Sequence, residues 1–334
     1  MSKSVLAVNF GSSSLKASFF EPDGGGRKDF RYEGITNHRE AIDHLLFDLG
    51  DNRPDIIGHR IVHGGDIEDQ WGVIDDEEHN RLLSLVHLAP LHMRANLLGY
   101  VLCKEVFNVP HIACYDTAFH ATMSDLATRL PIPEWLDIKK YGFHGLSYAH
   151  IAHKLPHYLG HAAYKNIIVA HLGSGSSLCM LKGLKSVETT MGYTPAGGVC
   201  MGTRPGDLDP GVILELAMRY NTNELSDLVY NQCGLLALSG GESADMRELI
   251  LAETPAADFA INYYCREIQG AIGSLAAKWC GAEAIVFTGG IGENSKAIRD
   301  LIMRPLDFLE LEELVIPTNE EETIRRYCDE YNSQ

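Results

Sequence analysis

A β-hairpin with glycine and serine residues at its tip occurs twice in this chain, and the repeat limits the possible folds more than any other feature. Residues 5–20 read as a strand, a Gly-Ser turn and a returning strand. Residues 167–181, about half the chain later, repeat the order of apolar run, polar residue, apolar residue, glycine, small polar turn and leucine. The matched positions are Asn9 with His171, Gly11 with Gly173 and Leu15 with Leu178.

Two copies of one hairpin predict a duplicated α/β domain whose two halves enclose a central cleft. The chain has 334 residues, of which 45% are hydrophobic, so it exceeds the comfortable size of one core and favours two domains. Each hairpin tip offers backbone N–H groups and hydroxyls to a phosphate. A chance likeness between two common hairpins is the alternative, and the repeat alone does not decide between them.

A helix, a buried strand and a glycine-rich turn follow one another late in the chain. Residues 258–279 have a helical period, and Gly281 is placed as the stop signal. The buried strand covers residues 284–288, and residues 289–294 then turn the chain into a further helix at Ser295. This order suits a nucleotide, but the chain has no P-loop sequence, so ATP would bind by another route. The predicted buried face of the first helix consists of Tyr264, Ile268, Ile272, Leu275 and Trp279.

The charge balance works against polyanions as default partners. Twenty-eight basic and 45 acidic side chains give a formal net charge of -17, which disfavours nucleic acid and anionic membranes. An anionic substrate therefore needs local arginines. No stretch reaches the ~18 apolar residues of a membrane span, and the N-terminal run has no cleavage site, so we expect a cytoplasmic protein. The eight cysteines contain no C-x-x-C pair, which favours buried free thiols.

Two arginines lie in polar, glycine-rich segments, residues 58–65 and 201–210. Phosphoryl transfer requires charge stabilisation and alignment, and a guanidinium group offers two parallel donors to a carboxylate or a phosphate. Arg60 and Arg204 are therefore the candidate anion clamp. An arbitrary arginine more often forms an ordinary salt bridge, but the neighbouring glycines permit close backbone approach and favour a functional role.

A carboxylate and a histidine are the next candidates. Asp116 directly follows a short apolar strand, the position at which open α/β sheets carry catalytic groups. His144 lies near two glycines in a Tyr-Gly-Phe-His-Gly segment, which suits a hydrogen bond to a transferring phosphoryl group. A lone histidine is more often structural, so His144 is singled out only by its neighbours.

A metal site built from histidines is not favoured. His150, His153, His157 and His161 have near-helical spacing, but Pro156 interrupts the run and no carboxylate joins them. A second pair, at positions 59 and 63, falls in a strand-like segment and does not share a helical face.

Taken together, the chain resembles the acetate kinase family, within the superfamily of sugar kinases, Hsp70 and actin. The matching motifs run in family order from end to end and are specific as a set. They lie at residues 9–16, 58–65, 88–92, 116–120, 141–145, 171–173, 201–204, 243–247, 288–294 and 316–320.

The resemblance implies a fold, a domain division and an assembly. The fold would consist of duplicated ribonuclease-H-like (actin-like ATPase) domains. Residues 1–117 and 322–334 would form the N-terminal lobe, to which the C-terminal segment returns. Residues 118–321 would form the C-terminal lobe, with the nucleotide site and the interface of a homodimer.

The resemblance also implies an activity and its catalytic residues. It implies reversible transfer of the γ-phosphoryl group between ATP and acetate, with Mg²⁺ (or Mn²⁺). Arg60 and Arg204 would hold the acid and the γ-phosphoryl group, while His144 and His171 would stabilise charge. Asp116 would govern the metal and the transferring group together with Glu320.

The remaining implied roles concern binding. The phosphate and metal region would contain Asn9, Ser12, Ser14, Lys16, His171 and Gly173, with Asn9 and Glu320 as the metal-binding residues. The adenosine would contact Asp245, Met246, Arg247, Gly290, Ile291, Gly292 and Asn294. The apolar pocket for the methyl group of the acid would consist of Val62, Leu91, Phe143 and Pro195. Val62, where a smaller residue would admit a longer acid, favours acetate over propionate.

The chain departs from the family pattern at several positions. Ser174 replaces the usual Asn and offers a shorter donor to phosphate, Met93 and Arg94 replace Asn-Pro, and Pro205 follows Arg204 where Ser is usual. The chain is also shorter than typical members. Two alternatives therefore stay open: a propionate or other short-chain carboxylate kinase, and a nucleotide-binding relative that has lost catalysis.

Overall fold

The structure is a computed structural model that describes residues 3–334 and divides into two compact units, each built on its own mixed sheet. The first unit contains the chain up to Ala121, Phe143–His150 and Asn319–Gln334. The second contains Thr122–Gly142 and Ile151–Thr318.

The first unit has a six-stranded sheet in the order β3-β2-β1-β4-β6-β5. β1, β2 and β3 form an antiparallel meander, whereas β1, β4 and β6 are parallel and β5 pairs antiparallel with β6. The strands are β1 (Val5–Phe10), β2 (Ser14–Phe20), β3 (Arg27–Glu33), β4 (Ile56–Ile61), β5 (Trp71–Val73) and β6 (His111–Tyr115).

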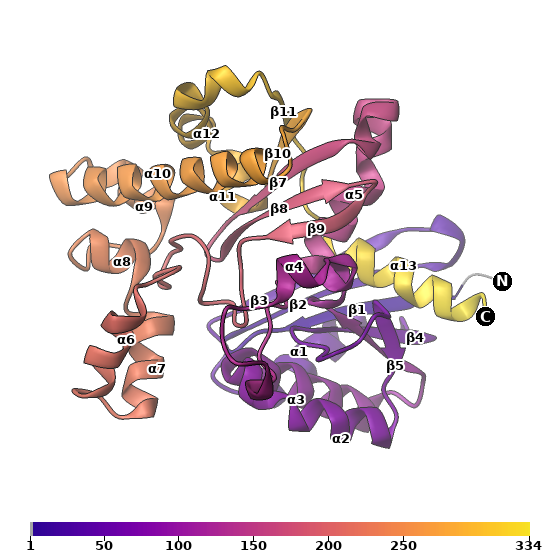
Figure 1. Ribbon diagram of the computed structural model, residues 1–334. Coiled ribbons are helices and arrows are strands. Elements are labelled where there is room, and N and C mark those ends of the chain that lie inside the picture. The colour runs from indigo at the N-terminus through magenta and orange to yellow at the C-terminus, as the bar shows by residue number, and fades with distance from the viewer. Residues whose placement is uncertain (1–2) are drawn as a thin grey trace. The chain divides into compact units, whose positions relative to one another are not determined.

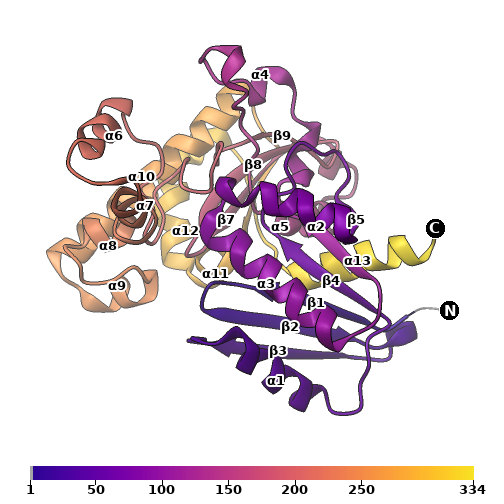
Figure 2. The ribbon, with the colours of Figure 1, turned by 90° about the horizontal axis from the view of Figure 1, so that it is seen from below.

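Helices cover both faces of this sheet (Figure 2). Successive side chains of a strand point to opposite faces, so alternate residues contact the helices on each face. The even-numbered residues Leu6, Val8 and Phe10 of β1 pack into one core with α1 and α3. The other face of β1 and β4 receives α13. The helices of this unit are α1 (His38–Leu49), α2 (Asp76–Ser84), α3 (Pro90–Val106), the start of α5 (Gly145–Leu159) and α13 (Glu320–Asn332).

The second unit has a five-stranded sheet in the order β11-β10-β7-β8-β9, which repeats the first sheet without its added strand β5. β7, β8 and β9 form the antiparallel meander, and β7, β10 and β11 are parallel. The strands are β7 (Asn166–Leu172), β8 (Ser176–Lys182), β9 (Lys185–Thr189), β10 (Ala284–Thr288) and β11 (Glu312–Val315). The repeated meander with two added parallel strands confirms the predicted duplicated ribonuclease-H-like fold.

The long helix α10 (Pro255–Lys278) packs against β7 and β8 and confirms the helix predicted for residues 258–279 (Figure 1). Thr254 caps its first turn by accepting from the backbone N–H of Ala257, and Pro255 occupies the first turn. The other helices of this unit are α4 (Asp125–Thr128), α6 (Pro210–Ala217), α7 (Thr222–Asn231), α8 (Gly234–Leu238), α9 (Met246–Ala252), α11 (Gly289–Asn294) and α12 (Lys296–Met303).

Three sequence predictions about local structure are wrong. Leu178 does not match Leu15, because Leu15 pairs with Phe10 next to the turn, whereas Leu178 pairs with Ala170 further from it. The glycine-rich turn is itself the short helix α11, and α12 begins at Lys296 with Ser295 as its cap. Pro156 does not interrupt the histidine-containing helix, since it lies inside α5.

Over the described residues, no helix is long and apolar enough to cross a membrane. All eight cysteines are free thiols, and six of them are buried. Within residues 3–334, no group of three or more His, Cys, Asp or Glu side chains is arranged to hold a metal ion.

Candidate active site

The side chain of Arg60 lies on the face of β4 that α13 covers. Gly58, two residues earlier, has the same orientation because side chains alternate along a strand. A Cβ atom on Gly58 would lie only 2.2 Å from Cγ2 of Ile324 in α13, so only glycine permits this approach. α13 begins at Glu320, and its close packing therefore brings that carboxylate to Arg60.

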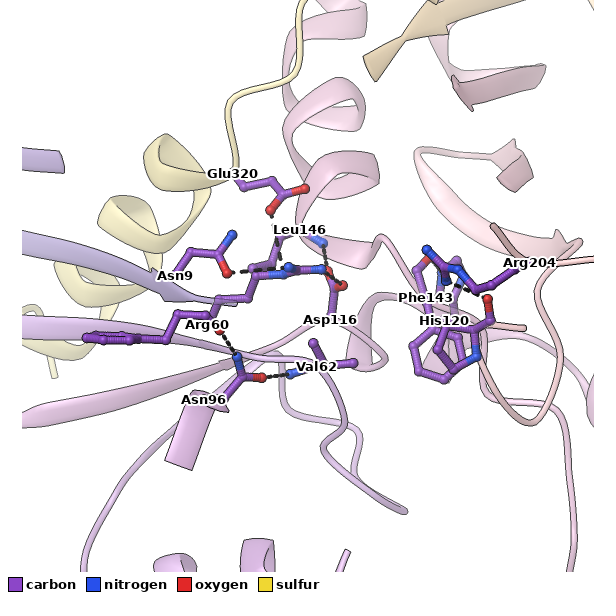
Figure 3. Close-up of polar contacts among 12 residues, drawn as sticks. Asn9, Arg60, Val62, Asn96, Asp116, His120, Phe143, Leu146, Arg204 and Glu320 are labelled. Atoms are coloured by element: carbon purple, nitrogen blue, oxygen red, sulfur yellow. Dashed lines mark hydrogen bonds and ion pairs between the residues drawn. The ribbon is translucent and has the colours of Figure 1, made fainter. Parts of the chain in front are cut away.

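Three polar side chains surround the guanidinium group of Arg60 (Figure 3). Nη2 donates to Oδ2 of Asp116 at 2.7 Å, and Nη1 donates to Oδ1 of Asn9 at 3.4 Å. Nε lies 3.6 Å from Oε2 of Glu320, and it makes no hydrogen bond within the described part of the chain. The Arg60 side chain is 19% exposed, so part of it remains accessible to a ligand.

Asp116 is held at the end of β6 by bonds on both sides. It is 1% exposed, and its backbone N–H donates to the carbonyl of Ile61 at 2.9 Å. Its Oδ1 accepts from the backbone N–H of Leu146 at 3.1 Å, and its carbonyl accepts from Gly145 at 2.8 Å. A Cβ on Gly145 would lie 2.1 Å from that carbonyl oxygen. The carboxylate therefore has a fixed orientation toward Arg60.

The charges in this cluster shift one another's protonation. Burial works against the charged form of Arg60, but Asp116 and Glu320 more than offset this and raise the pKa of Arg60. Burial raises the pKa of Glu320 to about 7, against the attraction of Arg60 and with the repulsion of Asp116 adding to the rise. Glu320 is therefore partly protonated near neutral pH, which reduces the negative charge beside the arginine.

Val62 and Phe143, predicted to contact the acid, are both buried in the first unit. The ring of Phe143 packs edge-on against His63, with the centroids 5.7 Å apart. Of Leu91, only its place in α3 is described. Pro195 belongs to the second unit.

His144 has a backbone φ of 60°, a conformation that non-glycine residues rarely adopt. Two residues before it, Gly142 also has a positive φ, of 81°. Directly after it, Gly145 lies against the backbone of Asp116. Within residues 3–334, six other non-glycine residues outside this site also have a positive φ, so the backbone conformation alone does not single out His144, and its role stays a prediction.

The tip of the first hairpin carries the remaining predicted residues of this unit. The backbone N–H of Gly11 donates to the carbonyl of Ser14 at 2.7 Å and closes the turn that contains Ser12. Lys16 pairs with Asn9 across β1 and β2, and its charge attracts the carboxylate of Glu320. Ser12 in the turn and Ser14 and Lys16 on β2 thus lie beside β1, the strand that carries Asn9.

A cavity of about 960 Å³ in the second unit collects most of the residues predicted to hold the adenosine. This volume is within the range of small-molecule sites. Its predicted lining residues are Gly173, Asp245, Met246, Arg247, Gly290, Ile291 and Asn294. Asp245 caps α9, and Asn294 donates from Nδ2 to the carbonyl of Gly290 at 2.9 Å.

Gly292 does not line this cavity. It is buried, and a Cβ there would lie 3.5 Å from the carbonyl carbon of Phe287, so this glycine packs toward β10. The neighbouring Glu293 fixes α11, because its Oε1 accepts from the backbone N–H groups of Gly289 and Thr318, each at 2.9 Å. Sequence reasoning did not identify Glu293.

The segment that carries Arg204 is tied to the second hairpin. The backbone N–H of Gly202 donates to the carbonyl of Ser174 at 3.1 Å, and Nη1 of Arg204 donates to the carbonyl of Pro195 at 2.6 Å. His171 lies on β7, and its side chain is mostly buried. The structure therefore brings Arg204 and Pro195 into direct contact.

Ser174, noted in the sequence as a shorter donor to phosphate, also lines the cavity, and sequence reasoning missed four further residues, namely Ala244, Ile250, Leu251 and Ser295. Ile250 and Leu251 follow Met246 and Arg247 by one helical turn of α9, so helical spacing carried a signal for them. Two apolar side chains there suit the flat face of a base.

Asn9 and Glu320, the residues predicted to hold the metal, suit Mg²⁺ in their chemistry. Both offer oxygen atoms, which Mg²⁺ prefers, and both lie beside Arg60. A bound Mg²⁺ would supply positive charge to the phosphate oxygens.

Two copies of one ribonuclease-H-like sheet, with a nucleotide-sized cavity in one of them, define a protein of the actin-like ATPase fold. The sequence profile of the acetokinase family matches residues 23–326. The chain therefore belongs to the acetokinase family, as the motifs in its sequence indicated.

Known proteins of this family match most of the chain. The acetate kinase of Nitrobacter hamburgensis is 39% identical over 345 residues, covering 92% of this chain and 85% of that relative. The propionate kinase of Citrobacter rodentium is 37% identical over 352 residues, covering 93% and 87%. The crystal structure of the Porphyromonas gingivalis acetate kinase matches with a TM-score of 0.85 and 30% identity, covering 99% of both chains.

The raised pKa of Glu320 predicts a specific pH dependence of stability. The folded carboxyl keeps its proton up to about pH 7, whereas in the unfolded chain it ionises near 4.5. Between these values the folded state binds more protons, so the unfolding free energy decreases as the pH rises. In metal-free buffer with EDTA, we expect this decrease to be smaller in Glu320→Gln, by up to roughly 3 kcal/mol. Urea unfolding at several pH values measures it, and parallel curves would contradict the shift.

Proposed function

We propose that the protein is an acetate kinase that transfers the γ-phosphoryl group between ATP and acetate. The observation that supports this most strongly is Arg60, whose guanidinium group is oriented by Asp116, Asn9 and Glu320 while its side chain stays 19% exposed. A guanidinium group arranged in this way suits a carboxylate. The neighbouring apolar residues Val62 and Phe143 suit a short acyl chain.

The proposed reaction requires alignment and charge stabilisation rather than a covalent enzyme intermediate. A carboxylate oxygen of acetate attacks the γ-phosphorus, and the bond to the bridging oxygen breaks. The electron pair stays on the β-phosphate of ADP, and acetyl phosphate forms without net proton transfer. Arg60 binds the acid, while Arg204, His144 and His171 stabilise the charge on the phosphoryl oxygens.

We propose that the cavity of the second unit binds the adenosine and that Asn9 and Glu320 bind Mg²⁺. Ile250, Leu251 and Ile291 offer apolar contacts to the base. The absence of a membrane-spanning helix in residues 3–334 is compatible with the cytoplasmic location that we infer from the family.

Trapping of the acyl phosphate by hydroxylamine tests the function with a panel of acetate, propionate and butyrate. With Mg-ATP and millimolar acid, we expect hydroxamate and the highest kcat/KM for acetate, because buried Val62 limits the space for a longer chain. A higher kcat/KM for propionate would support the alternative substrate. Tight ATP binding without any hydroxamate would contradict the proposal.

Arg60→Ala in the same assay links the activity to this site. We expect kcat/KM for acetate to fall by about two orders of magnitude or more, because the variant loses charge stabilisation in the transition state. Arg325→Ala is the matched control, since Arg325 lies on α13 and pairs with Glu322 and Asp329 of the same helix.

We further propose that the protein is a homodimer that associates through α6 and its flanking residues. This helix buries none of its residues within the chain, and its apolar side chains are exposed. Exposed apolar patches of this kind mark interaction surfaces. The exposed side chains are Leu208, Val212, Ile213, Leu214, Met218 and Tyr220.

Light scattering coupled to size-exclusion chromatography tests this assembly. We expect a dimer for the wild-type protein and a monomer for the double variant Leu214→Glu, Met218→Glu, because two buried carboxylates would oppose association. Leu126→Glu, at an exposed leucine of α4, is the control and should remain dimeric. A monomeric wild-type protein would refute the proposal.

A further inference from the structure

The side chain of Asn96 joins the ends of two strands in the first unit (Figure 3). Asn96 lies on α3 and is 3% exposed. Its Nδ2 donates to the carbonyl of Phe10, the last residue of β1, at 2.7 Å. Its Oδ1 accepts from the backbone N–H of Val62, directly after β4, at 3.0 Å. Both hydrogen-bonding groups of the amide therefore contact backbone.

The amide takes the place of a missing backbone pair. The parallel pairing of β1 with β4 ends at Val8 and His59, whereas β4 stays paired with β6 up to Ile61. Beyond this point the N–H of Val62 and the carbonyl of Phe10 bond to the amide of Asn96 instead of to each other. The amide offers one donor and one acceptor, as a peptide group does. Without it, a buried carbonyl and a buried N–H would lose their partners.

The two backbone groups that Asn96 joins belong to different parts of the site. Phe10 lies between Asn9, which contacts Arg60, and Gly11, which opens the hairpin turn. Val62 is the side chain proposed to contact the methyl group of the acid, and it follows Arg60 by two residues. Beyond the pairing of β1 with β4, the side chain of Asn96 thus links the hairpin turn to the segment of the acid pocket.

We infer that Asn96 is a positioning residue that fixes the acid pocket relative to the phosphate-binding hairpin and thereby contributes to the choice of acid. The inference rests on the proposed carboxylate kinase activity. Asn96 contacts no reacting atom; it acts through the backbone of Val62 and Phe10. Loss of the amide lets the two strand ends move independently, and small misplacements of reacting groups have large effects on rate.

The experiment compares Asn96→Ala and the milder Asn96→Ser with a matched control, Ser4→Ala. Ser4 is also buried and lies at the opposite end of the same two strands, where its Oγ donates to the carbonyl of Arg53 at 2.9 Å and to Oδ2 of Asp55 at 2.8 Å. For each purified variant, thermal unfolding, KM and kcat for acetate and propionate, and KM for Mg-ATP are measured.

We expect both Asn96 variants to have a higher KM for acetate and an acetate to propionate ratio of kcat/KM that falls by about tenfold. KM for Mg-ATP should rise by less than KM for acetate, because Phe10 adjoins Asn9 and the hairpin turn, whereas the residues proposed to bind adenosine belong to the other unit. Ser4→Ala should lower the midpoint of thermal unfolding and keep the wild-type ratio.

Two results would overturn the inference. The first is a wild-type acid ratio and wild-type KM values in folded Asn96→Ala or Asn96→Ser, which would make Asn96 a purely structural residue. The second is failure of both Asn96 variants to fold while Ser4→Ala folds. An inactive wild-type protein across the acid panel would instead refute the proposed function, and with it this role of Asn96.

Discussion

The ion pair between Arg60 and Asp116 is the interaction on which the rest of the candidate site depends. Asp116 is 1% exposed, so the pair is removed from water, and such pairs stabilise a protein only when the remaining polar atoms are satisfied. The backbone N–H of Leu146 satisfies the second oxygen of Asp116. On the arginine, Nη1 donates to Asn9 at 3.4 Å, and Nε lies 3.6 Å from the carboxylate of Glu320. The pair therefore gives the guanidinium group of Arg60 a fixed orientation at the site.

The duplicated fold explains how these groups come together. In the first unit, the parallel strands β4 and β6 end side by side, so Arg60 and Asp116 meet at one edge of the sheet. Gly58 lets α13 approach the same face, and Glu320 is the first residue of that helix. In the second unit, the same topology brings the β7–β8 turn and α11 to one cavity. Each half of the repeat thus supplies a different part of the chemistry.

Much of this arrangement could be predicted from the sequence, because apolar strands, glycine turns and motif order are local signals. The repeated hairpins and α10 were predicted from such signals, whereas the cavity residues of α9 and α11 came from the family resemblance. Asn96 and Glu293 were not, because each binds at least one backbone group distant in sequence, and a single polar residue in a helix carries no such signal. The mismatch of Leu15 with Leu178 arose because the two turns differ in length, which only the strand register reveals.

A double-mutant cycle on kcat/KM for acetate, with Arg60→Gln, Asp116→Asn and the double variant, measures whether the two residues act as one unit. If Asp116 acts by orienting Arg60, each single variant should lose nearly as much activity as the double variant, with a coupling of about 2 kcal/mol or more. Losses that add independently, in variants that remain folded, would show that the ion pair is not what organises this site.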